Sequence, residues 1–362
     1  MNKHEAKGDF SLIPRPSHEL TAPLIGRSRI LGEMVEETLA FGREEAFAKA
    51  ARFKIGDYSW CDPDYRQILL WAEALKMDSL LVIEKLVAGK DPHGVATQFQ
   101  DGRMLSLSWN LAELPLLDFC EGLTVQELRL YRQVGGEPKQ SEIGKISLTV
   151  PTLRLLHCGY GRLQFLSLSG IAHLTELWCF TNELTDLNLF QVPKLTKLLC
   201  SGNQLTKLDL SHVPSLVELS CSCNPLMELD LCYVPNLKEL SCMKNQLRKL
   251  NLCHIPNLTK LRCSQNQLTE LDLPKVPNLT ELWCGDNQLR ELDLSRVPHL
   301  TELWCGDNQL RELDLSCVPH LTELSCIRNQ LRELDIRALR KLTKLYYDSG
   351  KTRLIQRPDQ SF

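Results

Sequence analysis

Leucine and cysteine recur with a fixed spacing over the second half of the chain, in residues 153–347. Each unit reads L-T-x-L-x-C-x-x-N-Q-L-x-x-L-D-L-S-x-V-P-x, and successive units begin 21 residues apart. Exposed and buried positions alternate along the x-L-x-C end of each L-x-x-L-x-C segment, which is the pattern of a β-strand with one buried face. Each unit therefore predicts one short strand and a loop that leads to the next turn.

The units are close copies of one another. Two neighbours, 279–299 and 300–320, differ only in having Arg296 or Cys317 at one position. A single unit exposes an apolar edge that only another unit can cover, so stacked units share one core. The repeats predict a solenoid whose strands pair in parallel. The units begin at Leu153, Leu174, Leu195, Leu216, Leu237, Leu258, Leu279, Leu300 and Leu321.

Nine of the fifteen cysteines occupy one position of the repeat. Free cysteine is often a small buried apolar residue. A zinc site needs four converging ligands, and a disulfide needs converging Cβ vectors, whereas a straight column has parallel ones. We therefore expect core packing, with no metal and no other cofactor. The column is Cys158, Cys179, Cys200, Cys221, Cys242, Cys263, Cys284, Cys305 and Cys326.

An asparagine column runs beside the cysteines, from Asn182 to Asn329 in steps of 21 residues. An inward amide can bond to backbone groups that a tight bend leaves unpaired. We interpret this column as scaffold.

A period of 20–29 residues with regular leucines is the signature of a leucine-rich repeat. Over residues 146–347 the sequence resembles bacterial leucine-rich repeats of the internalin kind, in the variant where cysteine replaces a core leucine. The resemblance implies an α/β leucine-rich-repeat solenoid with a parallel β-sheet on its concave face. Proteins of the internalin kind carry secretion signals and wall anchors, which we do not find here, so we do not carry over their adhesive role.

The remaining sequence predicts four further segments. Residues 1–27 are expected to form an extended arm. Residues 28–90 are expected to form an N-terminal α-helical domain, with a second helix around 43–53 and later ones beginning near Asp62-Pro63 and Ser79. Residues 91–152 are expected to be degenerate repeats that cap the solenoid of 153–347, and 348–362 a basic tail.

Charge and hydropathy exclude several classes of protein. The net charge is −3, so the chain as a whole has no electrostatic basis for binding nucleic acid. No apolar run approaches the roughly 20 residues that cross a membrane. The first sixteen residues have no apolar stretch of the kind found in secretion signals. We therefore expect a cytoplasmic protein with reduced thiols, although non-classical export as an effector stays open.

Aromatic residues suggest where a partner would bind. The residue before each column cysteine should point outward from the concave sheet, and Trp, Tyr and Arg dominate interface hot spots. We predict one protein-binding patch at Arg262, Trp283 and Trp304, with Glu281 and Glu302 beside it, and a second at Trp178 and Phe180. The alternative is incidental decoration, because one duplication accounts for both Trp283 and Trp304.

Catalytic motifs are absent from the sequence, which contains no HExxH, GxSxG or GxGxxG. We therefore predict a non-enzymatic interaction module that is monomeric and binds an unknown partner protein, with no nucleic acid, membrane or small-molecule substrate. The alternative is a bacterial effector or enzyme whose activity lies in residues 28–150 and whose repeats choose the target.

Overall fold

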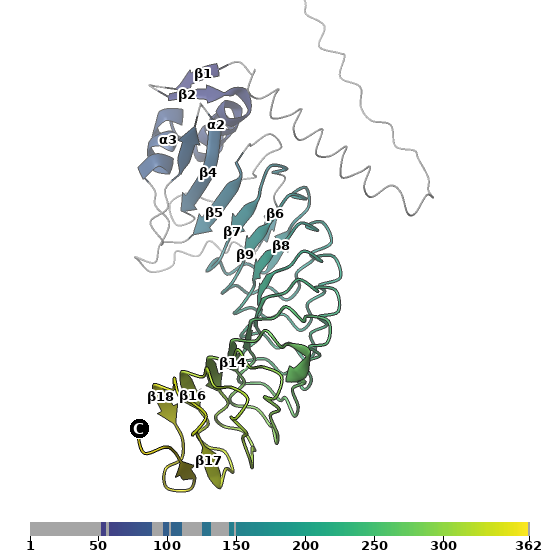
Figure 1. The fold of residues 1–362 in the computed structure, drawn as a ribbon. Helices are drawn as coiled ribbons and strands as arrows, with labels where there is room; N and C mark the ends of the chain where they lie inside the picture. The colour runs from purple at the N-terminus through teal and green to yellow at the C-terminus, as the bar shows by residue number, and fades with distance from the viewer. Residues whose placement is uncertain are drawn as a thin grey trace, which may run out of the picture. The chain divides into compact units, whose positions relative to one another are not determined.

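The computed structural model describes residues 52–55, 58–88, 97–100, 103–110, 125–131, 145–147 and 150–360. Over these residues one 13-stranded sheet follows the inner curve of the solenoid (Figure 1). Its order is β18-β16-β15-β14-β13-β12-β11-β10-β9-β7-β5-β4-β3. All neighbours pair in parallel except β3 and β4, which are antiparallel.

The repeats pair without any shift of register, so Leu198 lies beside Leu219 and Leu282 beside Leu303. Each residue is therefore adjacent to its equivalent in the next turn. The strands of the regular turns are β7 Leu155–His157, β9 Glu176–Trp178, β10 Lys197–Leu199, β11 Glu218–Ser220, β12 Glu239–Ser241, β13 Lys260–Arg262, β14 Glu281–Trp283, β15 Glu302–Trp304, β16 Glu323–Ser325 and β18 Lys344–Tyr346.

The cysteine column is buried as predicted, and all nine thiols are free. Burial raises the pKa of Cys158, Cys221 and Cys284 to about 12, because a thiolate in the apolar core would lose its hydration. The thiols are therefore protonated and chemically inert at neutral pH. Their role is to fill space between the leucine columns.

The asparagine column is also scaffold, as predicted. In Asn266, Nδ2 donates to the carbonyl oxygens of Cys242 and Cys263, at 2.9 and 3.0 Å. The Oδ1 atom accepts the backbone N–H of Leu247 at 3.1 Å. One side chain thus satisfies backbone groups in its own turn and in the preceding one. The same bonds recur at Asn203, Asn224, Asn245, Asn287, Asn308 and Asn329.

The residue before each asparagine has a left-handed backbone. Examples are Thr181 with φ 55° and Asp286 with φ 54°. An L-residue is disfavoured there by roughly 1–2 kcal/mol, and only Gly202 in this column avoids that strain. The asparagine bonds therefore hold a sharp bend that local conformational preference opposes.

The degenerate repeats continue the main sheet. Two of their strands are β4 Arg103–Asn110 and β5 Glu127–Tyr131. A further strand, β6 Lys145–Ser147, pairs with β8 Phe165–Ser167 in a separate small sheet. The antiparallel β3 Gln98–Gln100 forms the edge of the main sheet.

The segment predicted as a helical domain contains a β-hairpin as well as two helices. Strands β1 Arg52–Ile55 and β2 Tyr58–Cys61 are antiparallel, and α2 Asp62–Leu75 and α3 Ser79–Ala88 follow. The predicted helix at 43–53 is therefore wrong from Arg52 onward, since alternating apolar residues around Gly56-Asp57 favour a hairpin. Its first part lies outside the described residues, as does the predicted arm of 1–27.

Helix α2 contributes Ile68, Trp71 and Ala72 to the core, each at most 7% exposed, whereas Leu69 is 40% exposed. No helix in the described part of the chain combines the length and apolar character needed to cross a membrane.

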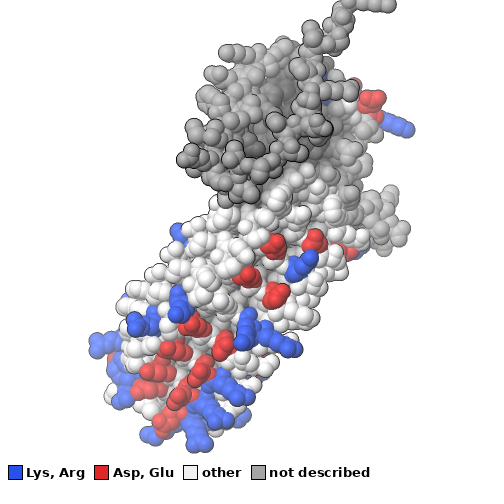
Figure 2. Space-filling model, turned by 90° about the vertical axis from the view of Figure 1, so that its right-hand side faces the viewer, with Lys and Arg blue, Asp and Glu red and all other residues white. Residues whose placement is uncertain are grey.

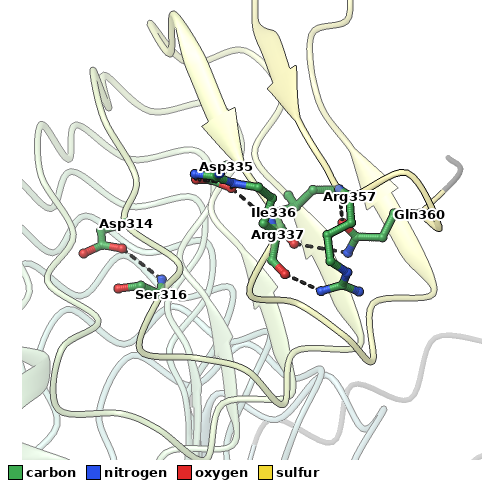
Figure 3. Close-up of polar contacts among 7 residues, drawn as sticks. All are labelled: Asp314, Ser316, Asp335, Ile336, Arg337, Arg357 and Gln360. Atoms are coloured by element: carbon green, nitrogen blue, oxygen red, sulfur yellow. Dashed lines mark hydrogen bonds and ion pairs between the residues drawn. The ribbon is translucent and has the colours of Figure 1, made fainter.

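The segment predicted as a basic tail packs against the last turn through residue 360. Strand β19 Arg353–Ile355 pairs in parallel with β17 Glu333–Asp335. Figure 3 shows the side chain of Gln360, whose Nε2 donates to the carbonyl of Ile336 at 3.2 Å and also to that of Leu339 at 2.9 Å. These bonds satisfy carbonyls that no further repeat covers, so the segment acts as a C-terminal cap.

Substitution of Asn266 by alanine tests the asparagine column. It leaves two buried carbonyls and one N–H unpaired, so we expect unfolding to become easier by about 2–4 kcal/mol. Asn278→Ala is the matched control, since Asn278 is exposed and makes one bond of 3.3 Å to Pro256. Thermal unfolding followed by circular dichroism measures both, and equal melting temperatures would contradict the scaffold role.

Thiol labelling tests the burial of the cysteine column. In the native chain we expect at most the six cysteines outside the column to react, and all fifteen to react in guanidinium chloride. Four of the six are exposed in the described residues, namely Cys223, Cys232, Cys253 and Cys317. Rapid native reaction of more than six thiols with an aromatic disulfide reagent would refute the packing.

Candidate binding surface on the concave sheet

Two columns of side chains face outward from the main sheet. In a strand such as β15, Leu303 is buried, and Glu302 and Trp304 project from the opposite face because successive residues of a strand alternate. In-register pairing places each such side chain beside its equivalent in the next turn. The first column is charged, and the second holds aromatic residues, arginine or serine.

Four predicted residues form one connected cluster, because Arg262 projects from β13 toward Glu281 and Trp283 of β14. Its guanidinium donates twice to the Glu281 carboxylate, at 2.5 and 3.2 Å, and lies 4.5 Å from the centre of the Trp283 ring. The Trp283 and Trp304 rings are 5.5 Å apart with an interplanar angle of 35°. The carboxylate of Glu281 raises the pKa of Arg262 through this bidentate bond.

Tyr346 extends this cluster, although the sequence prediction did not include it. Its ring centre lies 6.3 Å from that of Trp304, and Tyr346 is 49% exposed. Ser325, the residue between them in the column, is only 7% exposed. The signal was available, since Tyr346 stands in the same column of the incomplete final unit. We call Arg262, Trp283, Trp304 and Tyr346 the aromatic row.

The charged column beside the aromatic row contains three glutamates on adjacent strands, Glu281, Glu302 and Glu323. Arg262 pairs with the first, and Lys344 pairs with the third at 2.6 Å. Within residues 150–360, Glu302 forms no ion pair. Of these three glutamates, the predicted residue Glu302 is therefore the one that is not ion-paired.

The second predicted patch is a separate cluster. Trp178 and Phe180 are brought together by His157, whose ring centre lies 5.3 and 5.4 Å from theirs. Tyr160 packs edge-on against Phe180 at 5.2 Å and is 56% exposed. The Nζ atom of Lys197 lies 5.5 Å from the centre of the Trp178 ring. The sequence missed His157, Tyr160 and Lys197 because their relevance depends on contact between turns.

Serines separate the two clusters. The hydroxyls of Ser201 and Ser220 are 2.8 Å apart, as are those of Ser222 and Ser241. The Ser201 hydroxyl also accepts the backbone N–H of Ser222 at 3.0 Å, which links adjacent turns. The central turns therefore present a small hydroxyl surface that uses much of its hydrogen-bonding capacity internally.

Rows of acidic residues follow another side of the solenoid, flanked by Lys and Arg (Figure 2). The Asp members accept a backbone N–H two residues on, as Asp314 does from Ser316 at 2.9 Å (Figure 3). Hydrogen bonds from the side chain and the backbone N–H of the serine two residues later lower the pKa of Asp209, Asp293 and Asp314. Asp272 makes no such bond because proline, which has no N–H, stands two residues later. The aspartates of this side therefore stabilise turns on a solvated surface. Within the described ranges no three His, Cys, Asp or Glu side chains form a metal site.

Comparison with known sequences supports the repeat assignment. The sequence model of the family described as "Leucine Rich repeats (2 copies)" matches residues 277–317. Those residues lie in the two near-identical turns that carry Trp283 and Trp304. The fold of residues 153–347 is a leucine-rich-repeat solenoid with a buried cysteine column. No curated protein matches the sequence.

Solved structures share the leucine-rich-repeat fold. A leucine-rich-repeat protein from Leptospira interrogans is 24% identical over 64% of this chain and 62% of that one, with a TM-score of 0.55. YopM from Yersinia enterocolitica is 27% identical over 69% and 63%, with a TM-score of 0.52. The functional domain of InlJ from Listeria monocytogenes, described as including a cysteine ladder, is 33% identical over 55% and 49%, with a TM-score of 0.49. The chain thus spans between half and two thirds of each of these structures.

A double-mutant cycle of Arg262→Ala and Glu281→Ala tests the ion pair of this cluster. We expect a coupling of about 1 kcal/mol in unfolding free energy, because the bond is bidentate although the Arg262 side chain is 40% exposed. The control cycle, Lys344→Ala with Glu323→Ala, should give about 0.3 kcal/mol, because a single ammonium contact on a 55% exposed side chain is more screened. Equal coupling energies in the two cycles would contradict the stronger, bidentate pairing of Arg262 with Glu281.

Proposed function

We propose that the chain is a non-enzymatic interaction module that binds a partner protein on the concave sheet of its solenoid. The observation that carries this proposal is the aromatic row, four adjoining side chains on one face that end in Trp304, 39% exposed, and Tyr346, 49% exposed. The leucine-rich-repeat fold is typical of protein-binding modules, and its concave face is the usual binding surface.

The residue types of the aromatic row and the fixed position of Arg262 suit a binding hot spot. Arginine, tryptophan and tyrosine are the residues enriched where most of an interface's energy lies. The ion pair with Glu281 and the stacking on Trp283 hold Arg262 in place before a partner arrives. A side chain that is already ordered loses little conformational entropy on binding, so more of the contact energy appears as affinity.

Duplication explains why two tryptophans are present but not how they are arranged. Trp283 and Trp304 belong to copied units, yet Arg262 and Tyr346 come from turns outside that copy. Both of these side chains join the row through ring or cation contacts. The surface therefore draws on four different turns, which supports a selected patch over incidental decoration.

A reducing, cytoplasmic location is part of the proposal. Four exposed cysteines of the described residues are free, as expected of a chain kept where thiols stay reduced. Fluorescence microscopy of the tagged chain in its own cells is the direct test.

Quantitative affinity capture with the wild-type chain and Trp283→Ala/Trp304→Ala tests the function. We expect the double variant to lose specific partners, since truncating two hot-spot residues weakens an interface by about 2 kcal/mol or more. Phe190→Ala/Tyr233→Ala is the matched control, because these aromatics are 61% and 47% exposed outside the sheet. Melting curves should show all variants folded. Identical partner lists from wild type and the Trp variant would refute the patch.

A further inference from the structure

We propose that Glu302 and Trp304 together form a recognition site for an arginine side chain supplied by the partner. The proposal rests on the proposed function, since it names what the concave surface recognises. It is carried by a comparison between two copies of the same pair of residues, only one of which is occupied within the chain.

The occupied copy shows the chemistry. The strand triplet Glu281-Leu282-Trp283 presents a carboxylate and an indole side by side, and the guanidinium of Arg262 from the preceding turn lies against both. The planar cation donates two charge-assisted hydrogen bonds along its edge and stacks on the ring with its face. This carboxylate-and-indole pair is thus a ready-made receptor for guanidinium.

The second copy has the same sequence and backbone but lacks the cation. Strand β15 repeats the triplet as Glu302-Leu303-Trp304, paired in register with β14. The position that Arg262 occupies relative to the first copy is held here by Trp283, which brings no charge. Glu302 has no ion pair among the described residues, and Trp304 is 39% exposed. A guanidinium from a partner would therefore reach the Glu302 carboxylate and the Trp304 ring from the exposed side, because the Trp283 ring, 5.5 Å from that of Trp304, fills the place of Arg262.

Neighbouring charges leave Glu302 as the point of attraction. Glu281 on one side is neutralised by Arg262, and Glu323 on the other side by Lys344. A single negative charge therefore remains in the middle of the three-glutamate run, directly beside exposed aromatic surface. Such a site favours one cationic residue over a long basic segment.

The other end of the sheet uses related chemistry. Lys197 lies over the Trp178 ring at 5.5 Å and pairs with Glu218 at 2.7 Å. The concave face therefore holds a cation between carboxylate and indole at two places with its own residues. At Glu302 and Trp304 the cation must come from another molecule, and the guanidinium of the occupied copy identifies arginine as the better fit than lysine.

Peptide display on the full-length chain tests the site, with counter-selection on Trp283→Ala/Trp304→Ala. The best enriched peptide is then synthesised, and its binding to the chain is measured by calorimetry with each arginine replaced in turn by citrulline, the neutral isostere, or by lysine. We expect one arginine whose citrulline replacement weakens binding about tenfold or more, with lysine intermediate.

The chain variants Glu302→Gln and Glu323→Gln complete the test as a matched pair from one column. Glu302→Gln should weaken the peptide about tenfold, with no further loss on adding the citrulline replacement, because both changes remove the same contact. Glu323→Gln should change binding less than about twofold, since its partner is Lys344. Both substitutions are on half-buried side chains and keep the side-chain size, and melting curves should show that they fold.

The outcomes separate this proposal from the function on which it rests. Peptides that depend on the tryptophans but bind citrulline as well as arginine, or that are insensitive to Glu302→Gln, overturn the arginine site and leave the binding surface standing. A preference for lysine over arginine also overturns it. Failure to enrich any peptide over the counter-selection refutes both.

Discussion

The hydrogen bonds from each asparagine side chain to the two neighbouring cysteine carbonyls are the interaction on which the solenoid depends. The chain bends sharply after every strand, with the residue before the asparagine in a left-handed conformation that most residues resist. Carbonyl and N–H groups at such a bend would be buried without partners, which is costly in an apolar core. One amide satisfies groups from two turns, as Asn266 does for Cys242 and Cys263. The same side chain thus completes the bend and joins consecutive turns.

Exact stacking of equivalent residues has a consequence for the surface. A side chain that projects from one turn meets its equivalents above and below, so the recognition chemistry is assembled between turns. Arg262 on β13 becomes part of a binding cluster only because β14 places Glu281 and Trp283 beside it. Copying a unit reproduces its own residues but not its neighbours, and for this reason two identical strand triplets have different electrostatic surroundings.

The two ends of the solenoid are capped in different ways. Toward the N-terminus the parallel sheet ends at the short antiparallel β3, and α2 and α3 carry part of the buried core. At the C-terminal end, Gln360 satisfies the carbonyls of Ile336 and Leu339. Both devices use sequence outside the repeat, as they must, because a further repeat would only expose another edge.

The period of 21 residues by itself determined the parallel solenoid, the buried cysteine and asparagine columns and the outward position of Trp283 and Trp304, since stacking converts sequence period directly into spatial neighbours. Outside the regular repeats the sequence predicts less. It does not predict the hairpin of β1 and β2, and it does not predict the cap at 348–360, because a cap depends on long-range bonds such as those of Gln360. Only the tertiary structure decided which charges are neutralised. Arg262 pairs with Glu281 and Lys344 with Glu323, which leaves Glu302 without an ion pair in the described solenoid, because side-chain direction across adjacent strands cannot be read from spacing.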